Sequence, residues 1–143
     1  MTSYKEIIYP SDEKNPYPQK LADHLYDRFI KPLIKEGQTL KVLDIGCCTG
    51  NALKMFNKRG NLDLYGIDLR DERSEGFVFK ACDLEREKIP FDDNTFDVVY
   101  SKSVLEHVKN TDNFVSESLR VLKPGGKFIG MCPDWHSQFR NYW

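Results

Sequence analysis

The chain has 143 residues, of which 40% are hydrophobic and 30% charged, and its formal net charge is -1. This length suits one domain with one core. The near-neutral charge gives no global positive field for nucleic acid or anionic lipid. No apolar stretch is long enough to cross a bilayer, and residues 1–10 lack a signal-peptide core. We therefore expect one globular cytoplasmic domain, with neither nucleic acid nor a membrane as its partner.

The N-terminal part of the sequence predicts an irregular arm followed by a helix. Residues 1–16 are polar and contain prolines, which is typical of irregular structure. Over residues 17–36 apolar side chains recur about every fourth residue, the spacing of one face of a helix. Pro32 should kink or end this helix near Lys31. The apolar stripe predicts packing against the core.

Short apolar runs alternate with helical stretches along the rest of the chain. A helix is expected at 51–58, and a further helical stretch begins over 103–108. Thr111 is expected to cap another helix, over 112–122. Strands that alternate with helices imply right-handed crossovers and a doubly wound parallel sheet. The expected strands cover residues 40–45, 62–67, 77–81, 96–100 and 127–132.

The four cysteines and three histidines do not form a pattern typical of a metal site. A zinc site needs two spaced cysteine pairs or nearby histidines, and the sequence has no C-x-x-C pair. A disulfide between the adjacent Cys47 and Cys48 would close a strained ring. We therefore expect reduced, buried thiols and no metal.

The first expected strand leads into a small-residue loop, in the stretch VLDIGCCTGN. A dinucleotide-binding loop needs G-x-G-x-x-G, and counting from Gly46 places Cys48 and Asn51 at the second and third glycine positions. A P-loop needs Gly-Lys-Ser/Thr, which is absent. These mismatches disfavour a nicotinamide-dependent oxidoreductase, which remains one alternative.

The same stretch resembles the first motif of class I S-adenosylmethionine-dependent methyltransferases, an acid followed by G-x-G-x-G. Asp44, Gly46, Cys48 and Gly50 stand at these positions. In that family the loop backbone passes close to the methionine moiety of the cofactor. Cysteine at the middle position is compatible with this where φ is negative, and a positive φ would disfavour it. We expect a tolerated small residue and reduced cofactor affinity, with a redox-sensitive thiol as the alternative.

Further stretches resemble the later motifs of this family, in order, over residues 40–132. Asp68 closes LYGIDLR about 20 residues beyond the loop, where a carboxylate can accept hydrogen bonds from ribose hydroxyls. Its alternative role is to cap a turn. ACDLEREKIPFDDNTFDVVYSKSVLEHV resembles the third and fourth motif region, where Asp83 would meet the adenine amine, and LRVLKPGGKFI matches the turn before the fifth strand. The resemblance implies cofactor contacts at Asp44, Gly46, Cys47, Cys48, Gly50, Asp68, Leu69, Cys82, Asp83, Leu84 and Ser101.

The resemblance implies methyl transfer from S-adenosylmethionine to a small-molecule acceptor. In this family the loop after the fourth strand, here residues 100–103, normally faces the methyl group. It lacks the Asn/Asp-Pro-Pro-Tyr pattern of enzymes that act on amide or adenine nitrogens, which disfavours those acceptors. His107 is the one imidazole near this region and is the candidate base, with structural packing as its alternative role. A module that binds the cofactor or its product without turnover is the other functional alternative.

The family fold is a three-layer α/β/α, Rossmann-like sheet with strand order 3-2-1-4-5. Residues 69–76 are too few for the usual crossover helix and should form a solvated loop. The usual C-terminal helix and antiparallel strands are lacking, which suggests a fragment of a longer protein. The aromatic tail, 133–143, would cover the exposed fifth strand or form a partner surface, such as that of a homodimer. The single domain thus divides into an arm (1–16), a helix (17–36), a cofactor-binding core (40–132) and this tail.

Overall fold

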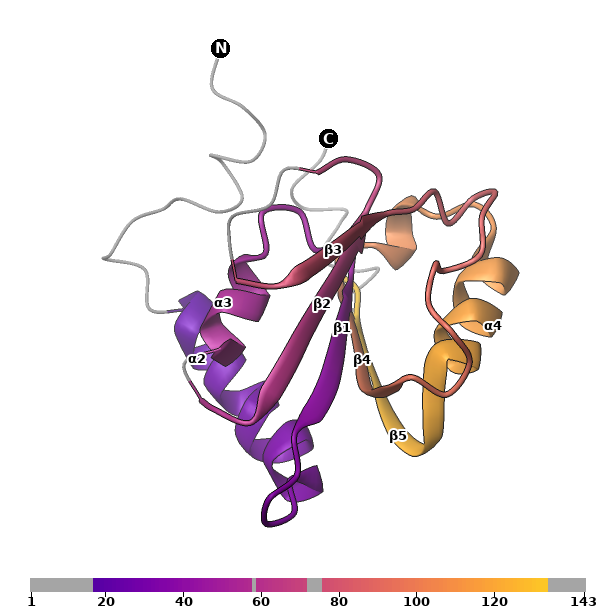
Figure 1. Ribbon diagram of the computed structural model, residues 1–143. Coiled ribbons are helices and arrows are strands. Elements are labelled where there is room, and N and C mark those ends of the chain that lie inside the picture. The colour runs from indigo at the N-terminus through magenta and orange to yellow at the C-terminus, as the bar shows by residue number, and fades with distance from the viewer. Residues whose placement is uncertain (1–16, 58, 72–75, 134–143) are drawn as a thin grey trace.

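The computed structural model describes residues 17–57, 59–71 and 76–133. Its centre is a parallel, 5-stranded sheet in the order β3-β2-β1-β4-β5 (Figure 1). The expected fold class and strand order are therefore confirmed. The chain runs outward from β1 to β3 and then returns to β4, so the topological switch point lies between β1 and β4. Open α/β sheets bind ligands beside the carboxyl ends of their strands at this point.

The strands form where apolar side chains can be buried on both faces of the sheet. All residues of β4 except the last are buried, as expected for a central parallel strand. One of the two edge strands, β5, begins earlier than expected and includes Pro124, which an edge strand tolerates. The strands are β1 (Leu40–Ile45), β2 (Leu62–Asp68), β3 (Val78–Ala81), β4 (Phe96–Lys102) and β5 (Leu122–Met131).

The N-terminal helix changes its winding before it ends. Helix α2 (Tyr17–Leu25) continues as a π turn, η1 (Tyr26–Ile30), and then as a 3-10 turn, η2 (Lys31–Leu33). Pro32 lies in η2, and Ile34 is already extended. The proline ring removes one helical hydrogen bond and crowds the preceding turn, so the backbone departs from α geometry there. The expected end near Lys31 is confirmed, whereas continuation to residue 36 is not.

Two further helices lie between strands, and a third helical segment is shorter than expected. Helix α3 is Asn51–Asn57 and helix α4 is Thr111–Val121. The cap of α4 is Asn110 rather than Thr111, because the Asn110 side chain accepts a hydrogen bond from the amide of Asn113. The stretch expected to be helical at 103–108 contains only the 3-10 turn η3 (Leu105–His107). Ser103 has a φ of 56°, which interrupts a right-handed helix.

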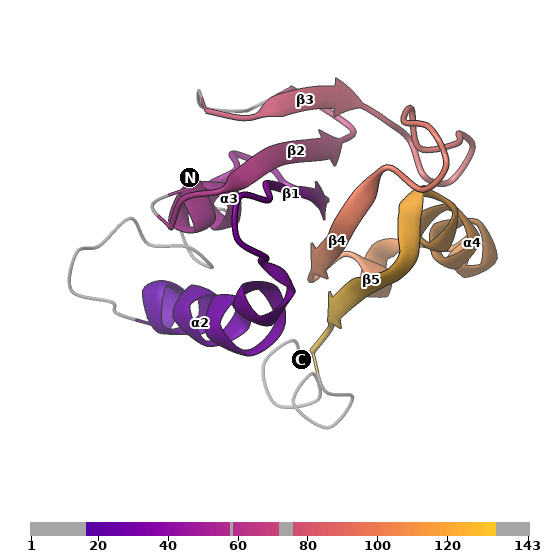
Figure 2. The ribbon, with the colours of Figure 1, turned by 60° about the horizontal axis from the view of Figure 1, so that its bottom comes forward.

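The three layers place two separate cores on the faces of the sheet (Figure 2). Helices α2 and α3 cover one face, where Leu53 and Phe56 pack against Val42 of β1. Helix α4 covers the other face, where Phe114 packs in the same cluster as Leu43. Neighbouring residues of β1 thus enter opposite cores, as the pleat of a strand requires.

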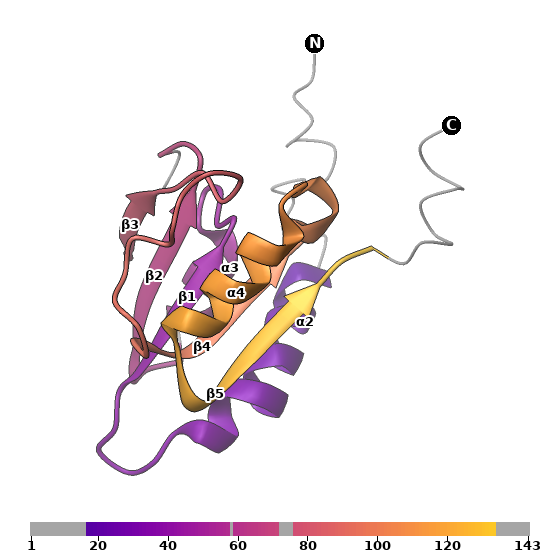
Figure 3. The same cartoon turned by 90° about the vertical axis from the view of Figure 1, so that its right-hand side faces the viewer.

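Both edges of the sheet leave apolar side chains exposed. Val78 on β3 is 48% exposed and Phe128 on β5 is 40% exposed, and the second edge lies beside α4 (Figure 3). The weak cover of β3 agrees with the short crossover before it. The N-terminal arm and the aromatic tail after residue 133 lie outside the described residues. Over the described ranges, the helices lack the length and apolar character needed to span a bilayer.

Candidate functional site

The loop after β1 is a tight turn fastened to β2. The amide of Gly46 donates to the carbonyl of Ile67 at 2.8 Å. Gly46 and Gly50 have φ values of 76° and 77°, which disfavour any side chain. A Cβ on Gly46 would overlap Val104, and one on Gly50 would overlap Phe77. Both glycines are therefore required by the packing around the loop, a role that the sequence motif alone did not indicate.

Cys48 occupies a strained position in this loop. Its φ is 47°, in the left-handed region, so the negative φ that would suit a cysteine is not present. Its side chain is exposed, and its amide donates to Oδ2 of Asp68 at 2.9 Å. The loop therefore keeps the conformation of a glycine at this position, and its contact with Asp68 is made through the backbone.

The four cysteines divide into two environments. Cys47 and Cys82 are buried, whereas Cys48 and Cys132 are exposed, so the expectation of buried thiols is correct for only the first two. All four are free thiols. Burial raises the pKa of Cys82 to about 11 and holds that of Cys47 well above its ordinary value. Both buried thiols therefore stay protonated at neutral pH and are poor nucleophiles.

Asp68 ends β2 and fixes the loop with both of its oxygens. Oδ1 accepts from the amide of Leu69 at 2.7 Å, and Oδ2 accepts from the amide of Cys48. A carboxylate has about four acceptor positions, so two remain after these contacts. The turn-capping role considered for Asp68 is thus present. It leaves capacity for further donors.

Asp44 is the buried acid of the site. Its side chain is only 4% exposed and accepts no hydrogen bond from the described residues. Burial, and then the negative charge of Asp68, raise the pKa of Asp44 well above its usual range, while Lys102 acts in the opposite direction. Among the described residues only Nε of Arg59 is a fully buried side-chain polar atom without a hydrogen-bond partner, so the Asp44 oxygens keep some access to solvent.

Lys102, the last residue of β4, was not among the residues expected to form the site. Burial lowers its pKa, and the charge of Asp44 partly offsets that shift. The sequence did contain a signal, because a lysine at the end of a buried apolar strand places its charge near the strand end. Only the parallel pairing of β1 with β4 shows which acid lies beside it.

The segment after β3 also lies at the strand ends, but its polar groups are paired within the chain. Oδ1 of Asp83 accepts from the amide of Glu85 at 3.0 Å, and the amide of Asp83 donates to Glu87 at 2.7 Å. The Glu85 carboxylate accepts from the amides of Lys109 at 2.6 Å and Asn110 at 3.0 Å. These contacts tie the segment to the start of α4. Its other two expected site residues, Cys82 and Leu84, belong to the core beneath it.

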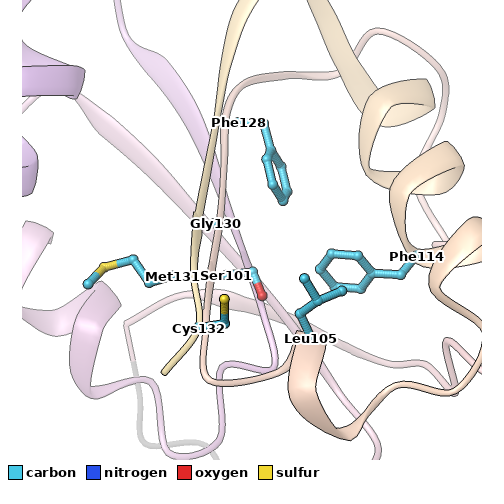
Figure 4. A pocket seen from close by; sticks show the side chains of 7 residues that line it. All are labelled: Ser101, Leu105, Phe114, Phe128, Gly130, Met131 and Cys132. Atoms are coloured by element: carbon cyan, nitrogen blue, oxygen red, sulfur yellow. The ribbon is translucent and has the colours of Figure 1, made fainter. Parts of the chain in front are cut away.

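Ser101 lines an apolar hollow of about 280 Å³ on the α4 side of the sheet (Figure 4). It follows Tyr100, the strand partner of Asp44, so alternation along β4 places its side chain on the face opposite to that of Asp44. Figure 4 shows Phe114 and Leu105 facing this hollow, whereas the Met131 side chain points to the opposite side of β5. His107 is exposed at the end of η3 and is not among the residues that line the hollow. The structure therefore brings together Asp44, the loop and Asp68, and places the side chains of Ser101 and His107 elsewhere.

Comparison with known proteins agrees with this geometry. The sequence profile described as "Methyltransferase domain" matches residues 43–130, more than half of the chain. The sterol 24-C-methyltransferase erg6 of Schizosaccharomyces pombe is 30% identical over 124 residues, which cover 78% of this chain and 32% of that protein. The ubiquinone/menaquinone biosynthesis C-methyltransferase UbiE of Idiomarina loihiensis is 36% identical over 104 residues, which cover 63% of this chain and 41% of that protein. This chain therefore matches less than half the length of either relative.

A solved structure shows the same fold over nearly the whole chain. The PH0226 protein from Pyrococcus horikoshii superposes with a TM-score of 0.75 at 21% identity, covering 99% of this chain and 71% of that one. Fold, strand-end loop and sequence profile agree, and the chain therefore belongs to the class I, S-adenosylmethionine-dependent methyltransferase family.

Proposed function

We propose that this domain binds S-adenosylmethionine at the carboxyl ends of β1 and β2 and transfers its methyl group to a small-molecule acceptor. The observation that carries the proposal is the buried carboxylate of Asp44, which has no hydrogen-bond partner among the described residues. Asp68 adds a second negative charge that is close enough to raise the pKa of Asp44. Two neighbouring carboxylates favour a cation. S-adenosylmethionine carries an ammonium group and a sulfonium, so it fits these residues.

The adenosine end of the cofactor is proposed to lie against Asp68 and the segment after β3. Each oxygen of Asp68 already accepts one amide hydrogen, so the carboxylate is oriented before a ligand arrives. A preoriented acceptor loses little freedom when ribose hydroxyls bind to it. Asp83 and Leu84 would then meet the adenine, with the Asp83 carboxylate partly engaged by the amide of Glu85.

When bound, S-adenosylmethionine supplies the electrophilic methyl group. The chain would hold this group in line with the acceptor and exclude water, so that proximity provides much of the acceleration. The acceptor is proposed to approach over the loop that follows β4. His107 stays a predicted base for this step, and its exposed position on η3 would require the acceptor to bind at the surface. A small organic acceptor is supported by the two relatives, which are named as methyltransferases of a sterol and of quinone biosynthesis.

The direct test is calorimetric titration of the chain with S-adenosylhomocysteine, the demethylated product, with NAD titrated in parallel. We expect micromolar binding of S-adenosylhomocysteine and none of NAD. The matched variant is Asp44→Asn, which keeps the size of the side chain but removes its charge, and we expect at least tenfold weaker binding. Tight binding of NAD, or equal binding of S-adenosylhomocysteine to both proteins, would overturn the proposal.

Binding without turnover is the second candidate, and two observations favour it. The exposed His107 has no hydrogen-bonded orienting partner among the residues described, and Cys48 strains the loop at a position that suits glycine. Incubation with S-adenosylmethionine and a panel of quinol, sterol and amine acceptors separates the two. Formation of S-adenosylhomocysteine that depends on an acceptor would exclude the binding module. Its absence across the panel, in a chain that binds the product, would support it.

A further inference from the structure

The outer edge of β5 and the flank of α4 beside it expose apolar side chains. Phe128 of β5 stays partly exposed, although its ring meets that of the buried Phe114 edge-on, with 6.3 Å between the ring centroids. On α4, Val115 is 47% exposed and Leu119 is 56% exposed. Residues four apart lie on the same side of a helix, so these two form one stripe. Leu105 of η3 is also exposed.

The opposite flank of α4 is already covered by the chain. The Asn113 side chain donates to the carbonyls of Leu84 and Glu87, and Arg120 donates to that of Ile89. All three carbonyls belong to the segment between β3 and β4. With 3.6 residues per turn, the exposed apolar stripe of α4 lies on the other side of the helix from these contacts. It therefore faces the free edge of the sheet at β5 (Figure 3).

The hollow of about 280 Å³ described above lies at this edge and contains one polar group. Leu105, Phe114 and Phe128 line it together with Ser101 (Figure 4). Ser101 is only 3% exposed, and its hydroxyl has no hydrogen-bond partner among the described residues. A buried hydroxyl normally has such a partner. The hollow therefore suits an aromatic ring that carries a polar group of its own.

The chain carries rings of this kind directly after β5. Cys132 lines the hollow, and residues 134–143, which lie outside the described residues, have the sequence DWHSQFRNYW. The aromatic residues stand at 135, 139, 142 and 143, the spacing that gathers side chains on one face of a helix. Trp135 and Trp143 each combine a large apolar ring with one N–H donor.

We propose that residues 134–143 dock on the surface formed by Leu105, Val115, Leu119 and Phe128, with an indole ring in the hollow beside the Ser101 hydroxyl. Ten helical residues extend about 15 Å, more than the about 6 Å that separates Val115 from Leu119 along α4. Short tethers give effective concentrations of about millimolar, so the chain's own segment is favoured over a second copy. The docked rings remove apolar surface of α4 and β5 from water.

Tryptophan fluorescence of the full chain measures this docking directly. The chain has two tryptophans, and both lie in the proposed docking segment. If they are docked, their emission should lie at shorter wavelength than in the same chain unfolded in urea. Acrylamide should also quench them several-fold less efficiently than in the unfolded chain. Emission and quenching equal to those of the unfolded chain would overturn the proposal.

Two matched substitutions show where the indoles are held. Leu119→Lys places a charge at an exposed position of the docking surface, so it should move the emission to longer wavelength and increase quenching several-fold. Val78→Lys makes the same kind of change at the opposite edge of the sheet, where Val78 is similarly exposed, and should leave the fluorescence unchanged. Far-ultraviolet circular dichroism verifies that both variants are folded. Equal fluorescence of Leu119→Lys and wild type would place the indoles elsewhere and overturn the proposal.

Dilution distinguishes the segment from a second copy of the chain. Docking within one chain predicts a monomer in analytical ultracentrifugation and fluorescence that does not change on dilution. Loss of indole protection on dilution, together with a dimer at high concentration, would assign the surface to a second copy and overturn the proposal. None of these measurements involves S-adenosylhomocysteine, so this inference stands or falls independently of the proposed function.

Discussion

The segments that follow β1 and β3 both lie at carboxyl ends of the same parallel sheet, yet they treat their charged groups in opposite ways. After β3, the carboxylates of Asp83 and Glu85 accept backbone amides within the chain. At the end of β1, the buried carboxylate of Asp44 accepts none from the described residues. The first arrangement ties the segment to the start of α4, and the second leaves a carboxylate that can accept a hydrogen bond from a ligand. Strand-end position alone therefore does not show which carboxylates the chain itself already engages.

The largest effect is expected on stability, at the ion pair between Glu117 and Arg120 of α4, which binds the backbone of the segment between β3 and β4. Oε2 of the buried Glu117 accepts from the amide of Ile89 at 2.8 Å and from Arg120 at 2.6 Å. Arg120 also donates to the carbonyls of Ile89 and Phe91. Arg120→Met would leave a buried carboxylate without its cation, which typically costs about 3–5 kcal/mol. Urea unfolding should show this loss, while Arg86→Met, at an exposed position, should stay within about 0.5 kcal/mol. Similar losses in both variants would contradict the structural reading.

The second effect concerns ligand binding and compares Asp68, at the end of β2, with Asp83, in the segment after β3. We expect Asp68→Ala to weaken S-adenosylhomocysteine binding by about 1.5–3 kcal/mol, the range for hydrogen bonds to a charged group. Asp83→Ala should weaken it by less than about 1 kcal/mol, because Asp83 orders only its own turn through the amide of Glu85, whereas Asp68 also holds the amide of Cys48 in the loop after β1. Calorimetric titration of both variants measures the difference. Equal losses would show that contact with the loop after β1 does not distinguish the acid that binds the ligand.

Much of this architecture could be predicted from the sequence, because burial dominates it. The run 40–45 forms a strand with the expected bounds, and Asp44 and Asp68 lie at strand ends as expected. A short run that is apolar at nearly every position is typical of a strand in a parallel sheet, because both faces of such a strand are covered. Local backbone strain then limits the prediction at Ser103, whose φ of 56° reduces the expected helical stretch to a single turn.

Long-range contacts explain the remaining differences. Asn110 and Thr111 are both suitable helix caps by residue type. The amide of Asn110 is held by Glu85, which lies 25 residues earlier in the chain, and this contact places Asn110 at the cap. The same limit applies to Lys102, because the acid that acts on its pKa, Asp44, lies on β1, far away in the sequence. Residue types thus indicated the donors and acceptors, while their partners could be known only from the fold.

A third prediction uses the unpaired acid itself and concerns stability without ligand. Because burial raises the pKa of Asp44 in the folded state, its contribution to stability is fully present below the unfolded pKa and is lost as pH rises through the folded pKa. Asp44→Asn removes this penalty, so the free energy of unfolding at neutral pH should rise, while ligand binding weakens. The gain is partly offset by the lost attraction to Lys102. Urea unfolding at about pH 4 and about pH 7 should show a smaller gain at the lower pH. A variant less stable than wild type at neutral pH would mean that Asp44 is satisfied within the chain.

The smallest effect is expected at Cys48 and tests whether the loop is strained by a side chain. Its φ of 47° suits glycine, and a non-glycine residue in the left-handed region costs on the order of 1 kcal/mol. Cys48→Gly removes that cost but increases the freedom of the unfolded chain by about 0.4–1 kcal/mol, so the net change in the free energy of unfolding should stay within about 1 kcal/mol. Cys48→Ala keeps a Cβ and removes the thiol, so it separates backbone strain from sulfur chemistry. If strain sets the affinity, Cys48→Gly should bind S-adenosylhomocysteine a few-fold more tightly than wild type, and Cys48→Ala should match wild type. Tighter binding by Cys48→Ala as well would assign the effect to the thiol, and the loop would then differ from its glycine form in chemistry rather than in shape.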